Sequence, residues 1–237
     1  MSGGPDRPDH PWDLDPGEAR ALQEELRERV DLVPPADFEA RLVAGADMSI
    51  GRGETVGHAA FVVVDTAGME TVAEAAAGTR VDFPYVPGLL SFRELPALEA
   101  AWAELEVRPD VILFDGHGLA HPRRFGLACH GGLRLGVPAV GCAKSVLVGE
   151  HDPPGEERGA RTDLVHRGER VGAALRTRDA VRPVLVSPGH RMDLETALEV
   201  VLAVSPRYRV PEPIRRADRL VGRLRREAAG GGPSRSG

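Results

Sequence analysis

The sequence predicts an α/β protein with a central mixed five-stranded sheet, an antiparallel meander followed by parallel strands, flanked by helices. Three consecutive strand-like segments with short connections lie between residues 41 and 81, which is typical of a meander. After them, short continuous apolar runs alternate with segments of helical periodicity, which is typical of parallel strands covered on both faces. No internal repeat or long linker divides the chain, so we expect one domain over residues 16–227.

The first half of the chain supplies one helix and the meander. Residues 16–30 place their apolar side chains on one stripe and their charges elsewhere, which predicts an N-terminal helix. We expect the residues before it, 1–15, to be flexible. The meander strands are predicted at residues 41–50, 55–65 and 69–81.

The second half alternates helices and buried strands. Apolar residues from Phe92 to Leu105 recur at helical spacing, and residues 193–204 form a second amphipathic pattern. Continuous apolar runs predict parallel strands at residues 111–115, 139–143 and 183–187. Proline, glycine and charged residues predict a surface loop over 150–168, and we expect a disordered tail over 228–237.

Composition indicates an ordinary globular protein without a membrane partner. Hydrophobic residues make up 42% and charged residues 28% of the chain. No apolar run approaches the roughly 20 residues that span a bilayer, and residues 1–16 lack the apolar core of a signal peptide. Cys129 and Cys142 have neither metal-ligand nor disulfide spacing, so we expect two buried thiols in a reducing compartment and a cytoplasmic location.

Charge is unevenly distributed along the chain. The formal net charge of −6 argues against a polyanionic partner, but residues 1–40 alone carry −7, so the remainder is close to neutral at +1. Residues 205–227 hold eight arginines against three acidic residues, a local basic surface of the kind that contacts phosphates. A solvated amphipathic helix would show the same pattern.

Lysine usage singles out one position. Of the 30 basic residues, 29 are arginine, and Lys144 is the single lysine, placed among small residues in AVGCAKS. A lysine ammonium is a compact charge whose pKa shifts readily on burial, which arginine does not offer. Lys144 is therefore a candidate functional residue, although chance retention of one lysine explains the count equally well.

Two aspartates occupy unusual places in predicted strands. Asp47 lies within an apolar strand, and Asp115 ends the run VILFD, where ligands of α/β sheets collect. A turn or cap role explains either residue alone equally well. Two carboxylates on neighbouring central strands would repel each other unless a cation lay between them, and an all-oxygen site suits Mg²⁺ or Mn²⁺.

Glu94 has two interpretations. Ser91 and Glu94 match a capping box, in which Glu94 would only close the start of a helix. Pro96 argues against this, because with Ser91 as the N-cap it would be the fifth helical residue, whose N–H should already bond. If the helix begins nearer Pro96, Glu94 is free to point elsewhere.

Residues 115–132, DGHGLAHPRRFGLACHGG, combine three histidines with five glycines. A zinc site of His117, His121 and His130 is one interpretation, but HExxH and other recognised spacings are absent from the sequence. Glycines instead let a backbone approach a flat ligand and read its edge with N–H and C=O groups.

Residues 81–94, VDFPYVPGLLSFRE, hold three aromatic residues although aromatics make up only 4% of the chain. Prolines bracket Tyr85 and Val86, which stiffens the backbone and prevents full pairing as strand or helix. The stretch therefore predicts a rigid aromatic hairpin, for which a buried turn with a core tyrosine is the plain structural explanation.

Together these segments resemble the endonuclease V family of deoxyinosine-directed repair nucleases. The resemblance runs from about Val43 to Asp218 and is carried by GADMS, PYVPGLLSFRE, DGHGLAHPRRFGLACHGG, GCAKS, VSPGHRMDLETAL and PEPIRRAD. It implies an RNase H-like fold and a metal-dependent endonuclease. The implied reaction is hydrolysis of the second phosphodiester bond on the 3′ side of a deoxyinosine, which leaves 3′-hydroxyl and 5′-phosphate ends.

The resemblance also implies roles for single residues. It makes Asp47, Glu94 and Asp115 metal-binding catalytic carboxylates, Asp218 a more distant ligand, and Lys144 a catalytic residue that neutralises phosphate charge. The hairpin becomes a wedge that enters the duplex beside the damaged base, because stacking on an aromatic ring offsets the cost of unstacking. The implied wedge and base pocket comprise Pro84, Tyr85, Val86, Pro87, Leu90, Gly116, Gly118, His121 and Gly126.

The implied cofactor is Mg²⁺, with Mn²⁺ as a substitute, and the implied partner is DNA that contains deoxyinosine. A nuclease of the same fold that acts on inosine in RNA shares every motif. A non-catalytic nucleic-acid binder and a zinc hydrolase are the alternatives from other classes, and the sequence does not identify protein partners.

Overall fold

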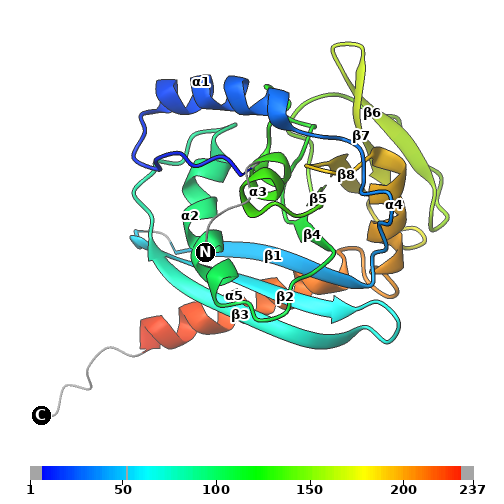
Figure 1. The fold of residues 1–237 in the computed structure, drawn as a ribbon. Helices are drawn as coiled ribbons and strands as arrows, with labels where there is room; N and C mark the ends of the chain where they lie inside the picture. Colours follow the sequence, from blue (N-terminus) through cyan, green and yellow to red (C-terminus); the bar gives the residue numbers. More distant parts are fainter. Residues whose placement is uncertain (1–6, 52, 231–237) are drawn as a thin grey trace, which may run out of the picture.

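The computed structural model describes residues 7–51 and 53–230, whose strands join into one mixed sheet with helices on both faces (Figure 1). The sheet has eight strands in the order β3-β2-β1-β4-β5-β8-β7-β6. The strands are β1 (Leu42–Ile50), β2 (Val56–Asp65), β3 (Glu70–Arg80), β4 (Val111–Phe114), β5 (Ala139–Ala143), β6 (Arg161–His166), β7 (Glu169–Leu175) and β8 (Val184–Pro188). The helices are α1 (Pro16–Leu26), the 3₁₀ turn η1 (Arg27–Arg29), α2 (Leu90–Ala103), α3 (Leu127–Leu135), α4 (Leu194–Ala203) and α5 (Glu212–Gly230).

The predicted meander and the parallel strands that follow it are confirmed. β1 pairs antiparallel with β2, and β2 pairs antiparallel with β3. β4 runs parallel to β1, and β5 runs parallel to β4. The α/β class predicted from the sequence is therefore correct, with the meander at one edge of the sheet.

The other half of the sheet differs from the prediction. The sheet has eight strands rather than five. All six predicted strand segments belong to it, and two strands were not predicted, because residues 150–168, expected to be a loop, contain β6, and β7 follows directly. Only Leu164 of β6 is buried, so its charged and exposed residues give no strand pattern. β8 pairs antiparallel with β5, not parallel, because an apolar run of five residues reveals burial but not direction.

The core lies in two layers, one on each face of the sheet. Neighbouring residues of β1 point to opposite layers, since Val43 packs with α4 and α5 whereas Ala44 packs with α2 and α3. Both faces of the central strands are thus covered, which explains their continuous apolar sequences. α1 lies outside α3, where Leu26 contacts Phe125 and Cys129 (Figure 1).

Residues 7–15 are packed, although the sequence analysis expected them to be flexible. The carbonyl of Pro8 accepts a hydrogen bond of 2.5 Å from Arg134 Nη1, and Trp12 Nε1 donates to Glu99 Oε2 at 3.1 Å. Asp15 then caps α1 through the backbone N–H groups of the first turn. The hydrogen bonds of Pro8 and Trp12 cannot be predicted from a segment rich in proline and charged residues, because each depends on a partner that is distant in the sequence.

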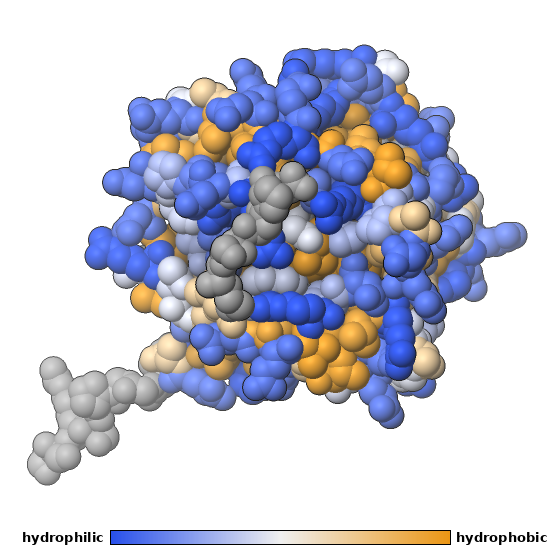
Figure 2. Space-filling view, viewed as in Figure 1, coloured by the Kyte–Doolittle hydropathy of each residue, from blue (hydrophilic) through white to orange (hydrophobic). Residues whose placement is uncertain are grey.

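The C-terminal helix is longer than expected. α5 continues to Gly230, so residues 228–230 are helical and not part of a disordered tail. The rest of that predicted tail, residues 231–237, lies outside the described residues. No helix of the described chain combines the length and the apolar character that crossing a membrane requires. The face seen in Figure 2 is largely hydrophilic, with hydrophobic residues in separate groups.

Candidate functional site

Two of the predicted carboxylates lie side by side on the central strands. β1 and β4 run parallel with Ala46 opposite Phe114, and the N–H of Asp115 donates to the carbonyl of Ala46 at 3.3 Å. Asp47, the next residue of β1, therefore lies beside Asp115, which directly follows β4. The parallel register brings together two residues that are 68 positions apart in the sequence.

Gly45 brings α5 close to the same place. A Cβ atom on Gly45 would lie 2.1 Å from the carbonyl carbon of Pro213, so only glycine lets the start of α5 rest on β1. Asp218 follows within the next turns of α5, is exposed, and raises the pKa of Asp47 through its negative charge. The fourth predicted carboxylate thus lies close enough to Asp47 for its charge to act on it.

Glu94 joins this group from α2. The capping-box interpretation is wrong, because α2 begins at Leu90 after the N-cap Leu89, and Ser91 is already within the helix. The alternative start near Pro96 is also wrong, since Pro96 lies inside the helix. Glu94 is held in the first turns of α2, close enough to Asp47 and Asp115 for their charges to raise its pKa.

We name Asp47, Glu94, Asp115 and Asp218 the carboxylate centre. Burial raises the pKa of Asp47 to about 7, and the charges of Asp115 and Asp218 add to the effect. Burial likewise raises the pKa of Glu94 to about 8, with help from Asp47 and Asp115. Several carboxylates that disfavour one another's ionisation have therefore been gathered at one end of the central strands.

Lys144 supplies a positive charge to the centre. It follows β5, and its ammonium donates a hydrogen bond to Asp115 Oδ2 while remaining 49% exposed. Burial opposes this charge, but the hydrogen bond and the charge of Asp115 raise the pKa of Lys144. Arg209 donates to the carbonyl of Lys144 at 3.0 Å and to that of Pro183 at 2.8 Å, which fixes the backbone around the lysine.

The carboxylate centre has the donor chemistry of a site for a hard divalent cation. All its donors are carboxylate oxygens, and their mutual repulsion is the kind of strain that a bound cation relieves. The side chains are not drawn tightly together, since the described residues contain no group of three or more His, Cys, Asp or Glu arranged to hold a metal ion. Binding a cation there would require their carboxylates to turn inward.

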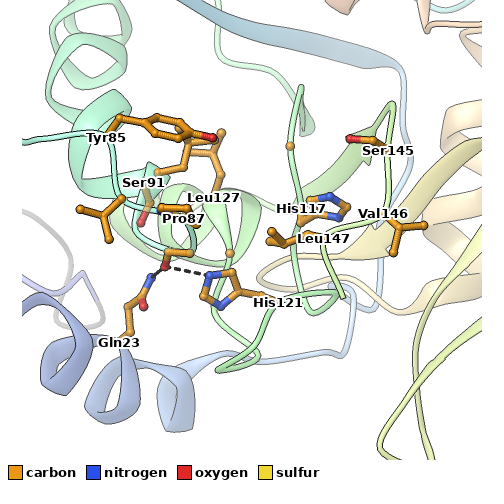
Figure 3. Close-up of a pocket in the computed structure, with 15 residues that line it drawn as sticks. Gln23, Tyr85, Pro87, Ser91, His117, His121, Leu127, Ser145, Val146 and Leu147 are labelled. Carbon is orange, nitrogen blue, oxygen red and sulfur yellow. Dashed lines mark hydrogen bonds between the residues drawn. The ribbon is translucent and has the colours of Figure 1, made fainter. Parts of the chain in front are cut away.

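A cavity of about 230 Å³ opens next to the centre, beside the proline-bracketed segment, which is a loop with a turn at Pro87–Gly88 and not a hairpin of two strands (Figure 3). We name it the hairpin cavity. Seven of the residues predicted for the wedge and base pocket line it: Tyr85, Val86, Pro87, Leu90, Gly116, His121 and Gly126. Tyr85 is 72% exposed at one side, which rules out the core-tyrosine explanation, and Val146 and Leu147 lie on the opposite side (Figure 3).

Two predicted residues lie elsewhere. Pro84 borders a separate cavity beside Trp12 and Arg93. Gly118 has a structural role, because a Cβ there would lie 1.9 Å from the carbonyl oxygen of Pro188 and its N–H donates to Ser187 Oγ at 2.8 Å. The chain bends at these positions, so Gly116 lines the cavity whereas Gly118 packs against the end of β8.

The turn at Gly88 fixes the wall of the hairpin cavity. Its carbonyl oxygen accepts hydrogen bonds from His121 Nε2 at 2.9 Å, Arg123 Nη2 at 2.8 Å and Gln23 Nε2 at 3.1 Å. Gly88 has φ +78°, a left-handed conformation that glycine adopts without strain. Two of these bonds are visible as dashed lines in Figure 3. The hairpin is therefore locked to α1 and to the 121–126 segment.

Several residues that line the cavity were not predicted to do so from the sequence. They are Gln23, Gly88, Ser91, His117, Leu127, Ser145, Val146 and Leu147. Gln23 left a signal, because it is a polar residue on the apolar stripe of α1 beside Ala19 and Leu26, and it is only 1% exposed. Residues 145–147 carry no such signal in the sequence, because they belong to the site only through their position directly after Lys144.

The histidines do not form a zinc site in the described residues. His130 uses both ring nitrogens, with Nδ1 on Ser91 Oγ at 2.9 Å and Nε2 on His10 Nε2 at 2.8 Å. Burial lowers the pKa of His121 to about 4, helped by the charge of Arg123, so this ring is neutral at physiological pH. His117 lines the cavity with a buried Nδ1 that has no partner among the described residues.

A basic surface flanks the carboxylate centre on α5. Arg215 and Arg216 pair with Glu212, and Arg215 also stacks 3.7 Å from the centroid of the Tyr208 ring. The arginines that remain exposed along the helix are Arg219, Arg223 and Arg226. The predicted basic surface is thus an exposed helix face next to Asp218.

Comparison with known proteins gives one consistent result. The family model described as Endonuclease V matches residues 24–219. A protein named Endonuclease V from Myxococcus xanthus is 58% identical over 215 residues, which cover 91% of this chain and 92% of that protein. The crystal structure of the Endonuclease V from Streptomyces avermitilis superposes with a TM-score of 0.89 at 46% identity, covering 94% of this chain and 99% of that one.

One solved relative contains nucleic acid. The Endonuclease V from Ciona intestinalis, in complex with a 24mer DNA containing an inosine followed by a ribo-adenosine, superposes with a TM-score of 0.74. It is 27% identical to this chain and covers 90% of it, with 98% of its own chain matched.

Proposed function

Because this chain belongs to the endonuclease V family of nucleic-acid hydrolases, we propose that it cuts DNA beside deoxyinosine. The bond cut is the second phosphodiester on the 3′ side of the lesion, and the products carry 3′-hydroxyl and 5′-phosphate ends. Such a cut opens the repair of deaminated adenine in the cytoplasm, a location with which two buried free thiols are consistent.

One observation carries the proposal: three segments each contribute both to the hairpin cavity and to the carboxylate centre or the lysine bonded to it. Gly116 lines the cavity next to Asp115 in the centre. Ser145 lines it next to Lys144, and Leu90 lies one helical turn before Glu94. A base held in the cavity would therefore keep its own strand within reach of the groups that act on a phosphate.

The cavity suits a single flipped base. Its volume of about 230 Å³ is below the ~300–1,000 Å³ of sites for drug-sized ligands. Tyr85 offers an exposed ring on one side, with the apolar side chains of Val146 and Leu147 opposite. Stacking on such a ring is worth about 1–3 kcal/mol per base, which offsets the cost of unstacking. This supports the wedge role of the hairpin in the proposal.

The carboxylate centre would perform the hydrolysis. Asp47, Glu94 and Asp115 would hold Mg²⁺, or Mn²⁺ in its place, with Asp218 as a more distant ligand. A divalent ion at such a site lowers the pKa of a bound water and stabilises the leaving oxygen. Lys144 would neutralise charge on the phosphate, because its ammonium already lies against Asp115.

The arginines of α5 would hold the DNA backbone. Arg219, Arg223 and Arg226 are exposed on the helix that also carries Asp218. Phosphate contacts of this kind add affinity without reading sequence, and they weaken as salt concentration rises. The strand that bears the lesion would then lie along α5 on its way to the carboxylate centre.

The test is a cleavage map. A labelled oligonucleotide with one deoxyinosine is incubated with the protein and Mg²⁺, and the product length and its ligation competence are determined. A cut one nucleotide beyond the lesion with a ligatable 5′-phosphate supports the proposal. Matched controls are the same oligonucleotide with deoxyadenosine and the Asp115→Asn protein, neither of which should give product.

Two further substrates address the alternatives. An RNA oligonucleotide with one inosine, offered in competition with the DNA, separates the endoribonuclease from the deoxyribonuclease. If neither is cut and binding to deoxyinosine DNA is unchanged in Asp115→Asn, the protein is a non-catalytic binder.

A further inference from the structure

A chain of hydrogen bonds reaches the hairpin cavity from the N-terminal segment. His10 Nε2 lies 2.8 Å from His130 Nε2, and His130 Nδ1 lies 2.9 Å from Ser91 Oγ. Ser91 is buried and lines the cavity (Figure 3), whereas His10 precedes α1. Nothing in the hydrolysis described above uses His10 or His130.

The direction of these hydrogen bonds is set at His10, the end that lies farthest from the cavity. His10 Nδ1 lies 3.0 Å from the carbonyl oxygen of Pro11, which can only accept, so Nδ1 carries the proton. In a neutral ring Nε2 is then the acceptor, and His130 Nε2 must donate to it. His130 Nδ1 is left as an acceptor, and the hydroxyl proton of Ser91 must point at it.

Both rings are neutral in their surroundings. Burial lowers the pKa of His130 well below its usual range, with His10 and Arg134 adding to the effect. Aromatic rings pack around it, at centroid distances of 5.1 Å from Phe92 and 5.0 Å from Phe125. Burial also lowers the pKa of His10, as does Arg134, against opposing contributions from the Pro11 carbonyl, Glu99 and Asp9.

The N-terminal segment is anchored so that His10 stays in place. Arg134 donates to Pro8 O at 2.5 Å and pairs with Glu99 at the same distance, while Trp12 Nε1 donates to Glu99 at 3.1 Å. The rings of His10 and Trp12 pack edge to face with centroids 4.6 Å apart. His10, which accepts the hydrogen bond from His130, is therefore held in place by contacts with α2 and α3.

We propose that this chain fixes Ser91 Oγ as a hydrogen-bond acceptor facing the hairpin cavity, where it reads the N1–H of hypoxanthine. With its proton committed to His130, the hydroxyl offers only lone pairs to a base. Hypoxanthine presents a proton at N1, whereas adenine presents a lone pair there, so adenine is rejected by repulsion. Ser91 is then a specificity-determining residue, and His10 and His130 are positioning residues that act through it.

This assignment rests on the proposed function only for the identity of the base. The tautomer of His130 is a property of the protein alone, so it is tested first. Long-range ¹H–¹⁵N correlation spectra of the ¹⁵N-histidine-labelled protein without DNA should show His130 protonated at Nε2 and not at Nδ1. A ring protonated at Nδ1, or at both nitrogens, overturns the proposal whether or not the protein cuts deoxyinosine.

Base discrimination tests the consequence. Cleavage efficiency is compared on DNA with deoxyinosine and on DNA with unsubstituted purine, which has a lone pair at N1. Ser91→Ala should lower the ratio of the two efficiencies about 3- to 10-fold, because one neutral hydrogen bond is lost. An unchanged ratio overturns the proposal.

His10 offers a matched pair of variants. His10→Phe keeps an aromatic ring beside Trp12 but removes the acceptor, so His130 is free to turn its proton toward Ser91. His10→Gln keeps a side-chain oxygen that can accept from His130. The ratio should fall in His10→Phe and recover in His10→Gln, with the His130 tautomer changing in parallel. Equal ratios in the two variants would show that His10 only packs and would overturn the relay.

Discussion

The carboxylate centre and the hairpin cavity are built from shared segments, yet their polar groups are held in opposite ways. In the cavity wall the Gly88 carbonyl has three donors, and one of them is His121, which is neutral at physiological pH. In the centre, burial and the charges of neighbouring carboxylates raise the pKa values of Asp47 and Glu94. Recognition is preorganised in the folded chain, whereas the chemistry is kept under electrostatic strain.

This contrast has a physical reason. A neutral pocket can be completed by the protein itself, because every donor finds an acceptor within the fold. A site for a cation and a phosphate must hold charge that only the ligands compensate, and it lowers stability until they arrive. Variants of the two regions should therefore separate binding from turnover and differ in their effect on stability.

The largest effect is expected for the aspartates of the central strands. Asp47→Asn or Asp115→Asn removes a ligand charge without touching the cavity, so cleavage should fall by at least about 10³-fold while deoxyinosine binding stays within about threefold. Single-turnover cleavage and binding are measured on one oligonucleotide. Near-normal turnover by either variant would remove the carboxylate centre from the mechanism.

Lys144→Arg should give the next largest loss. The lysine ammonium is a compact donor on Asp115, whereas a guanidinium keeps the charge but spreads it over a planar fork with a different hydrogen-bond geometry. We expect cleavage to fall about 10- to 100-fold with binding retained. Arg209→Lys, which alters the backbone anchor of Lys144 instead, is the comparison. Near wild-type activity of Lys144→Arg would make the single lysine accidental.

The fold and the site were predictable to different depths from the sequence. The meander, the parallel strands and the positions of Asp47 and Asp115 follow from strand periodicity and from the rule that strand ends meet at one edge. β6 was missed because its face is exposed and charged. The local sequence pattern predicts where a strand lies. It predicts neither the direction of β8 nor the pairing of β6 with β7 at the edge of the sheet.

Within the site, what escaped prediction depends on contacts across the chain. The bond from Gln23 to Gly88 spans 65 residues, and the bond from His10 to His130 spans 120. The spacing of Ser91 to Glu94 fits a helix cap, which was one of two interpretations, whereas the Ser91 hydroxyl is bonded to His130. A motif that fits a local role can thus hide a tertiary one.

Tyr85 tests the recognition side of the contrast. Tyr85→Ala should lower the affinity for duplex deoxyinosine about tenfold with little change in single-turnover rate at saturation, because stacking acts before the cut. The loss should be smaller on a single strand, where less stacking has to be broken. Tyr85→Phe, which keeps the ring, is the matched control and should be mild. Equal losses on duplex and single strand would reject the wedge.

The smallest effect, but the most direct measure of strain, is the pH dependence of stability without divalent ions. The pKa of Glu94 is raised from 4.5 to about 8, so between these pH values the folded chain keeps a proton that the unfolded chain has released. Stability must therefore fall as pH rises through this window.

Glu94→Gln mimics the protonated side chain. It should abolish the part of the loss of stability with rising pH that arises from Glu94. Its melting temperature in chelator should match wild type near pH 5 and exceed it near pH 8 by about 2–4 °C for each kcal/mol relieved. Glu104→Gln, an exposed site at the end of the same helix, should leave the profile unchanged. Adding Mg²⁺ at pH 8 should raise the melting temperature of wild type more than that of Glu94→Gln, because a cation relieves the repulsion that the variant already lacks. Parallel pH profiles for wild type and Glu94→Gln would show that the centre is not strained, and the contrast with the hairpin cavity would fail.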